Sequence, residues 1–147
     1  MTLTRLQGDI AFLNILWYDF PKEGLEVKTV ETPLPPAGAP VTVVIDRPLG
    51  SRHPAYPDLV YPVNYGYVPG LFAPDGEEQD VYILGVHRPL NSFTGELIAV
   101  IRRADDVEEK WVAAPVGLRF TAEEILEAVR FQEQYFQSTI HCLEPLP

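Results

Sequence analysis

Runs of β-branched and aromatic residues alternate with turn-rich segments through the middle of the chain. Four of these runs predict strands, at residues 41–45, 81–84, 97–101 and 110–114. Between the first and second run, recurrent prolines restrict the chain to loops and short extended pieces. Short strands separated by turns are typical of an antiparallel barrel or sandwich, so the pattern predicts a mainly β fold.

One amphipathic helix is predicted after these strands. Thr121 and Glu124 form a capping box, with the threonine as N-cap and the glutamate three residues later. After this box, mainly apolar residues recur at intervals of three or four, which places them on one face of a helix. One stripe of the predicted helix consists of Ile125, Val129, Gln132 and Phe136, with Ala128, Phe131 and Tyr135 beside it, and this side is mainly apolar. We expect the stripe to pack on the barrel and Tyr135 to reach its rim, facing a ligand.

The first forty residues differ from the rest. Residues 32–40 contain four prolines, which forbid a helix and suit an extended connector. We therefore divide the chain into an N-terminal extension with its proline-rich connector (1–40), a barrel with its helix (41–137) and a C-terminal tail (138–147). The extension is expected to pack on the barrel or on another subunit, and we expect a homo-oligomer.

Composition and charge exclude several classes of protein. The formal net charge of -10 counts against nucleic-acid binding, including that of an oligonucleotide-binding barrel, because phosphates need a basic surface. No apolar run reaches the ~18 residues of a membrane helix. The single cysteine, Cys142, rules out an internal disulfide and suits a reducing cytosol, so we expect a soluble cytoplasmic protein. The acidity serves solubility, or it allows phosphate to be handled through metal ions.

A carboxylate-rich loop precedes the second predicted strand. Asp75, Glu77 and Asp80 follow each other at i, i+2 and i+5, and Gly76 lets the backbone turn sharply between them. Three convergent carboxylates suit a hard cation such as Mg²⁺, which keeps several waters and takes few protein ligands. The alternative is a solvated turn before a strand.

A tyrosine-rich segment lies shortly before this loop. Residues 61–67 read Tyr-Pro-Val-Asn-Tyr-Gly-Tyr. Alternating aromatic residues of this kind are often barrel core, which is the structural alternative here. Tyrosine hydroxyls are also donors suited to phosphate oxygens. A tyrosine-rich strand followed some ten residues later by a carboxylate loop is rarer than either segment alone.

These segments, in this order, resemble the soluble (family I) inorganic pyrophosphatases. That family is similar in having a Tyr-Pro-x-Asn-Tyr-Gly-Tyr segment, an Asp-Gly-Asp-x-x-Asp loop that enters a strand, an acidic turn before Lys-x-Val-Ala-x-Pro, and a C-terminal helix with a tyrosine. Here residues 105–115 read Asp-Asp-Val-Glu-Glu-Lys-Trp-Val-Ala-Ala-Pro, and the match runs from about Val41 to Tyr135. The resemblance implies a five-stranded, OB-like closed barrel with one C-terminal α-helix.

The resemblance also implies an activity, the Mg²⁺-dependent hydrolysis of inorganic pyrophosphate to two phosphates. Its metal ligands would be Asp75, Asp80, Glu108, and either Asp105 or Asp106. Its phosphate contacts would come from Tyr65, Lys110 and Tyr135, with Arg52 near the position of a phosphate-binding arginine. Glu77 stands where the family has its middle aspartate, the candidate base for the attacking water.

The chain departs from the family pattern in several ways. The stretch from Asp46 to Arg52 is much shorter than usual, and the lysine and glutamate of that stretch have no counterpart. Phe136 stands where a second phosphate-binding lysine is common. Each missing cation weakens the hold on a highly charged substrate. The alternative is therefore a catalytically weakened or inactive barrel that binds phosphate or metal, or acts on another diphosphate.

Overall fold

The computed structural model describes residues 35–104 and 108–143, and these belong to one compact unit that begins at Pro35. Of the predicted extension, residues 1–34 lie outside the described part. The elements, in chain order, are β1 (Pro40–Arg47), β2 (Asn64–Phe72), β3 (Glu78–Ile83), β4 (Ser92–Arg103), β5 (Glu109–Ala114), α2 (Ala122–Glu133) and β6 (Ser138–Cys142). No helix in this part of the chain is long and apolar enough to span a membrane.

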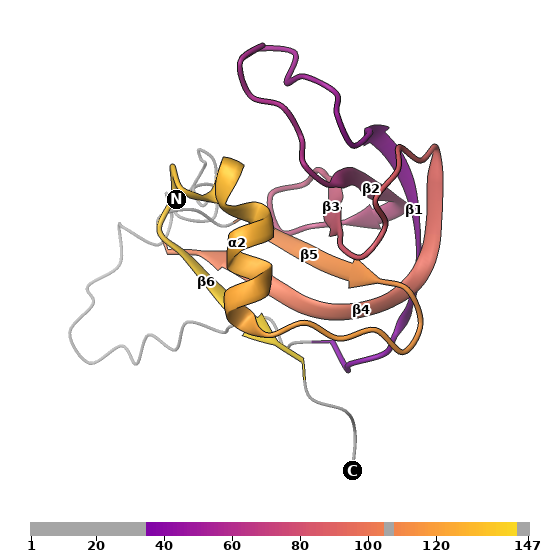
Figure 1. Ribbon diagram of the computed structural model, residues 1–147. Helices are drawn as coiled ribbons and strands as arrows, with labels where there is room; N and C mark the ends of the chain where they lie inside the picture. The colour runs from indigo at the N-terminus through magenta and orange to yellow at the C-terminus, as the bar shows by residue number, and fades with distance from the viewer. Residues whose placement is uncertain (1–34, 105–107, 144–147) are drawn as a thin grey trace, which may run out of the picture. The chain divides into compact units, whose positions relative to one another are not determined.

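Five of the strands close into a barrel (Figure 1). They follow each other in the order β1-β2-β3-β5-β4, and a further pairing between β1 and β4 completes the ring. Closure depends on the length of β4. Its first residues, Ser92–Glu96, pair with β1, and its remainder pairs with β5 and β6. The predicted mainly β, five-stranded closed barrel with a C-terminal helix is therefore confirmed.

The pairing of β3 with β5 corrects the expectation of an antiparallel barrel or sandwich. These two strands are parallel, with Tyr82 opposite Val112, whereas the other pairs are antiparallel. The reason is topological. A closed ring with an odd number of strands cannot alternate in direction all the way round, so one neighbouring pair must run the same way.

Strand β3 contributes to two hydrophobic cores at once. Val81 and Ile83 pack with Val43 of β1 in the barrel interior, whereas Tyr82 packs with Val129 of the helix on the outer face. Successive side chains of a strand point to opposite faces, so both faces of β3 are buried. Strand β1 instead alternates exposed and buried residues along its length.

The helix α2 covers one face of the barrel (Figure 1). Its predicted capping box is present, because the hydroxyl of Thr121 accepts from the backbone of Glu124 and the Glu124 carboxylate accepts from the backbone of Thr121. Ile125 and Val129 are fully buried, and so is Glu133 at the end of the same stripe. Strand β6 lies in the segment assigned above to a C-terminal tail, and it pairs with β4.

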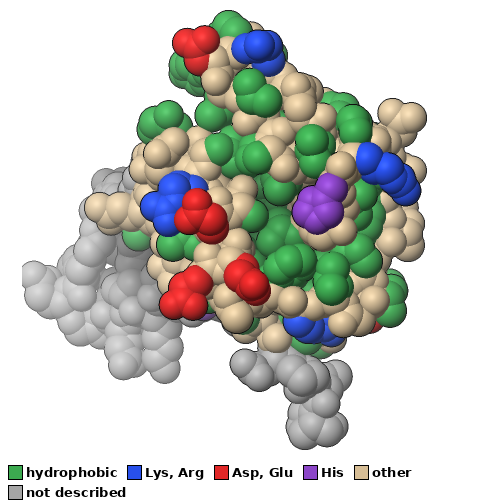
Figure 2. Space-filling model, viewed as in Figure 1, with side chains coloured by type: hydrophobic (Ala, Val, Ile, Leu, Met, Phe, Trp, Pro, Cys, Tyr) green, Lys and Arg blue, Asp and Glu red, His purple; other side chains and the backbone are tan. Residues whose placement is uncertain are grey.

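A long loop, residues 48–63, projects from the barrel between β1 and β2 (Figure 1). Its two limbs are joined by backbone hydrogen bonds, including His53 N to Leu59 O at 2.9 Å, and by a bridge between Arg52 and Val60. Figure 2 shows hydrophobic side chains exposed on this loop, at the top of the view. Tyr56 in this loop is 67% exposed.

Candidate active site

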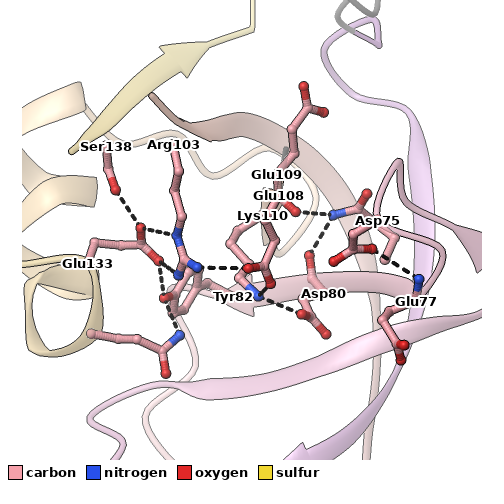
Figure 3. A network of polar contacts seen from close by, with 12 residues as sticks. Asp75, Glu77, Asp80, Tyr82, Arg103, Glu108, Glu109, Lys110, Glu133 and Ser138 are labelled. Atoms are coloured by element: carbon pink, nitrogen blue, oxygen red, sulfur yellow. Dashed lines mark hydrogen bonds and ion pairs between the residues drawn. The ribbon is translucent and has the colours of Figure 1, made fainter. Parts of the chain in front are cut away.

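Lys110 of β5 lies at the centre of a network of charged side chains (Figure 3). Its Nζ donates to Oδ2 of Asp80 at 2.6 Å and to Oε2 of Glu108. The ammonium also lies 5.6 Å from the centre of the Tyr65 ring. The lysine is only 4% exposed. Two carboxylates and a tyrosine therefore hold one buried cation in a defined position.

The surroundings shift the pKa values of this cluster in the directions expected for buried, paired groups. Burial works to lower the pKa of Lys110, but its interactions with Tyr65, Glu108 and Asp80 outweigh that and raise it. Burial likewise works to raise the pKa of Glu108, and the charge and hydrogen bond of Lys110 with the charge of Arg103 lower it overall. Lys110 therefore carries its charge at neutral pH, and Glu108 is ionised beside it.

A second buried cation, Arg103, lies next to Lys110. Its Nε and Nη2 donate to the two carboxylate oxygens of Glu133 at 3.1 and 2.7 Å, and its Nη1 donates to Oε1 of Glu108 at 2.9 Å. The ring of Phe136 covers the guanidinium at 3.6 Å. Tyr82 also donates its hydroxyl to Glu133 at 2.7 Å. This network connects the end of α2 to β4 and β3.

The carboxylate loop lies at the other end of the network (Figure 3). Oδ1 of Asp75 accepts from the backbone N–H of Glu77 at 3.0 Å, and Gly76 between them has a φ of 87°. Burial raises the pKa of Asp75, and the carboxylates of Glu108 and Asp80 act in the same direction. The surroundings of Asp75 therefore disfavour its charged form, chiefly because the carboxyl is partly buried.

A cavity of about 860 Å³ adjoins this network. Lys110 and Arg103 line it together with Arg47, which extends from the end of β1. Arg47 donates from Nη1 to the hydroxyl of Tyr61 at 3.2 Å, and within the described residues it makes no salt bridge. Arg47 is therefore a cation at the cavity wall that a bound anion could use directly.

The structure brings several of the predicted site residues together. Asp80, Glu108 and Lys110 are in direct contact, and Tyr65 packs beside the lysine. Tyr135 lies just past the end of α2, is 70% exposed and lines the cavity. The roles assigned to these residues in catalysis remain predictions.

Other predicted site residues are not among those that line the cavity, or they fall outside the described part of the chain. Arg52 is exposed in the projecting loop, where its Nη1 donates to the carbonyl of Pro57 at 2.8 Å, and it does not line the cavity. Glu77 is exposed, and its carboxylate makes no hydrogen bond or ion pair within the described residues. Asp105 and Asp106 lie outside the part of the chain that the structure describes.

Three charged residues at the site were not predicted from the sequence: Arg47, Arg103 and Glu133. Each continues a buried stripe. Arg47 follows the inward positions 41, 43 and 45 of β1, and Arg103 follows Ile101 on β4. Glu133 follows Ile125 and Val129 at intervals of four on α2. The three share one sequence feature, a charged residue at the end of a buried stripe, but that feature alone does not distinguish a buried side chain from a solvated one.

Only some of the predicted acidic residues are placed so that they could bind Mg²⁺. Within residues 35–104 and 108–143, no group of three Asp, Glu, His or Cys side chains is placed to hold a metal ion. Glu108 is engaged by both buried cations. Asp75 and Asp80 each keep one carboxylate oxygen outside these hydrogen bonds. Mg²⁺ is commonly held by one or two carboxylates with water and substrate phosphates, so these two residues suit an ion that arrives with its ligand.

Comparison with known proteins shows a likeness of fold. No family model and no curated protein matches the chain. Among solved structures, an inorganic pyrophosphatase from Neisseria gonorrhoeae is 24% identical, with a TM-score of 0.50 over 67% of this chain and 74% of that one. An inorganic pyrophosphatase from Ehrlichia chaffeensis is 17% identical, with a TM-score of 0.51 over 77% of this chain and 89% of that one. At these identities the likeness establishes a shared fold, and activity must be argued from the site.

Proposed function

We propose that this chain is a hydrolase that cleaves inorganic pyrophosphate, or a related small diphosphate, into phosphates in the presence of Mg²⁺. One observation carries the proposal. Lys110 lines the cavity and at the same time contacts Asp80, so a phosphate-binding cation and a carboxylate suited to Mg²⁺ lie side by side. The fold shared with inorganic pyrophosphatases of two bacteria supports the same conclusion.

The substrate's negative charge is met by the chain's own cations. Arg47, Arg103 and Lys110 all line the cavity, although the chain as a whole has a net charge of -10. Hydrogen bonds to charged acceptors are stronger than neutral ones, and guanidinium groups match phosphate oxygens in geometry. We expect Arg47 to make the first such contact, because it makes no salt bridge within the described residues.

In the proposed reaction a water oxygen attacks one phosphorus, and the bridging P–O bond breaks. Glu77 accepts the proton of that water, and Arg47 and Lys110 stabilise the charge that develops on the leaving phosphate. Asp75 and Asp80 would hold Mg²⁺, which when bound polarises phosphoryl oxygens and acidifies a coordinated water. Glu133 holds Arg103, and Arg103 in turn holds Glu108. Glu108 binds Lys110, so these contacts keep the lysine in position beside the substrate.

A second function is favoured by a different observation. Glu108, a predicted metal ligand, is bound by two buried cations, and the described residues contain no three-carboxylate metal group. A barrel that binds phosphate through Arg47, Arg103 and Lys110 without hydrolysing it would have this arrangement. The second candidate is therefore a phosphate-binding module derived from the same fold.

Phosphate release from pyrophosphate, measured with Mg²⁺ and again with excess EDTA, tests the proposal. Mg²⁺-dependent release that falls at least about tenfold in Arg47→Met, purified in the same way, supports the hydrolase and rules out a contaminating enzyme. Binding of methylenediphosphonate, a non-hydrolysable analogue, with no release of phosphate supports the binding module. Absence of both binding and release contradicts both functions.

A further inference from the structure

The cavity is much larger than the network of charged residues at its base. Its volume of about 860 Å³ lies in the range of ~300–1,000 Å³ that accommodates a drug-sized organic molecule. Inorganic pyrophosphate is far smaller than such a molecule. A ligand that contacted only the cations would therefore leave most of the cavity, including the projecting loop, without a contact.

A continuous series of aromatic rings leads outward from Lys110. The ammonium faces Tyr65, whose ring centre lies 5.6 Å from that of Tyr61. The ring of Tyr61 is stacked on His53 at 6.3 Å, and His53 lies 5.1 Å from Tyr56. Tyr65 and Tyr61 are buried, whereas Tyr56 is 67% exposed. The cavity thus has charged, buried residues at its base and an exposed aromatic residue at its opening.

Exposed aromatic side chains also come from the opposite element, the end of the helix. Phe136 lies over Arg103 at the base, and the neighbouring Tyr135 is 70% exposed and lines the same cavity. Large exposed rings on two different elements that line one cavity are typical of sites for planar ligands, since rings stack on rings. Tyr56 and Tyr135 together form what we call the aromatic rim.

Among the described residues that line the cavity, one is acidic, Asp58, and it lies near the aromatic rim. Asp58 lies two residues from Tyr56 in the projecting loop, whereas the three cations are on β1, β4 and β5. A carboxylate beside a phosphate would repel it. Beside a sugar hydroxyl or an amino group, a carboxylate is a suitable hydrogen-bond acceptor. The charges of the cavity are therefore arranged for a ligand with an anionic end and a neutral polar end.

We propose that the ligand of this cavity is an organic diphosphate that carries a planar ring, such as a nucleoside diphosphate. Its phosphates lie at Arg47 and Lys110, and its ring lies between Tyr56 and Tyr135 at the aromatic rim. The inference rests on the proposed function, because it places the phosphates in the same site and adds the part of the ligand that the aromatic rim would recognise.

Two probes that differ only in the organic part test the proposal. Methylenediphosphonate carries the diphosphonate alone, and α,β-methylene-ADP carries the same group with adenosine; neither is hydrolysed at the methylene bridge. Calorimetric titration of the full chain with each probe, in Mg²⁺, should show the adenosine compound binding about tenfold or more tightly. One base stacked on an aromatic side chain contributes an effect of this size.

Substitutions at the rim assign the preference to its residues. Tyr56→Ala and Tyr135→Ala should each reduce the preference for α,β-methylene-ADP several-fold. Tyr56→Ala should leave the affinity for methylenediphosphonate unchanged, because Tyr56 is not one of the predicted phosphate contacts. Phe72→Ala is the matched control, since Phe72 is 64% exposed and does not line the cavity. All three side chains are exposed, so these variants should fold as the wild type does.

The outcomes separate this inference from the proposed function. Equal or weaker binding of the adenosine compound, or a preference that survives both tyrosine substitutions, overturns the inference while the phosphate site stands. Failure of both probes to bind overturns the phosphate site and the inference together. Loss of binding of both probes in Arg47→Met, with the preference confined to the rim residues, confirms the division of the cavity.

Discussion

Glu133 holds Arg103 with both of its carboxylate oxygens. The donors are Nε at 3.1 Å and Nη2 at 2.7 Å, and the two side chains are 1% and 4% exposed. Ser138 donates to the same carboxylate at 2.6 Å, at the start of β6. A single buried glutamate therefore joins α2 to β4 and β6 and keeps a guanidinium at the base of the cavity.

Glu133→Gln should destabilise the protein by about 3–5 kcal/mol, because it leaves the guanidinium of Arg103 buried without its main counter-charge. Urea unfolding at pH 7 measures this change. Glu127→Gln is the control: Glu127 pairs with Arg130 on the exposed side of the same helix, and its loss should cost no more than about 0.5 kcal/mol. Equal losses of unfolding free energy in the two variants would mean that the buried ion pair stabilises the protein no more than the exposed one does.

Acid should weaken the same pair. Burial works to raise the pKa of Glu133, but the hydrogen bonds from Arg103 and Ser138 lower it overall. A carboxyl whose pKa is lower in the folded state stabilises the fold above its unfolded pKa of ~4.3, and this contribution is lost as the pH falls through the folded value. The stability of the wild type should therefore fall below about pH 4.3, and the fall should be shallower in Glu133→Gln.

The sequence could predict the elements whose residues follow a simple period. Strand β1 alternates between exposed and buried residues, and the capping box of Thr121 marks the start of α2. The sequence could not predict the partners of Arg103, because Glu133 lies thirty residues away and packing alone brings the two together. A charged residue at the end of an apolar strand is ordinarily solvated, so its burial becomes visible only with its partner.

The tyrosine-rich segment shows a second limit. Its Asn64 is fully buried and accepts from the backbone N–H groups of Leu49 and Leu90, both at 3.0 Å. The same side chain donates to the carbonyl of Arg88 at 2.9 Å. Asn64 therefore holds two loops on the barrel, whereas Tyr65 beside it faces the charged network. A motif quoted as one unit thus combines a structural residue with a candidate binding residue.

Asp75→Asn and Asp80→Asn should change stability in opposite directions in the absence of metal. Burial, and to a smaller extent the carboxylates of Glu108 and Asp80, disfavour the charged form of Asp75, so its neutralisation should raise the melting temperature by ~1–3 °C. Asp80 is paired with Lys110, so its neutralisation should lower the melting temperature. Both substitutions should abolish the stabilisation by Mg²⁺ that we expect for the wild type. Undiminished stabilisation by Mg²⁺ in both variants would exclude them as ligands.

Arg47→Met and Arg52→Met compare two candidate phosphate contacts that lie five residues apart. The sequence favours Arg52, whereas the structure has Arg47 lining the cavity and Arg52 bonded to Pro57 of its own loop. We expect Arg47→Met to weaken methylenediphosphonate binding by about tenfold or more, the effect of one charged hydrogen bond. Arg52→Met should change it by less than about twofold. The reverse order would return the role to Arg52.

Glu77 is the residue whose proposed role depends most on its exact length. It has the same charge as an aspartate, but one more methylene group moves its carboxylate by on the order of 1 Å. Misplacement on that scale costs roughly 100-fold in rate, so Glu77→Asp should raise pyrophosphate hydrolysis if the rest of the site is competent.

Glu77→Gln separates the proton acceptor from the rest of the loop. The glutamine keeps the backbone N–H that donates to Asp75 and removes only the exposed carboxylate, so folding and Mg²⁺ stabilisation should be unchanged. Turnover at saturating pyrophosphate should fall by ~100-fold or more, the usual cost of losing a general base. A loop adapted to the longer residue would make aspartate the poorer choice, and glutamine would still be damaging. Undiminished, Mg²⁺-dependent turnover in the glutamine variant would remove Glu77 from the mechanism and transfer the role to another carboxylate, with Glu108 the next to test.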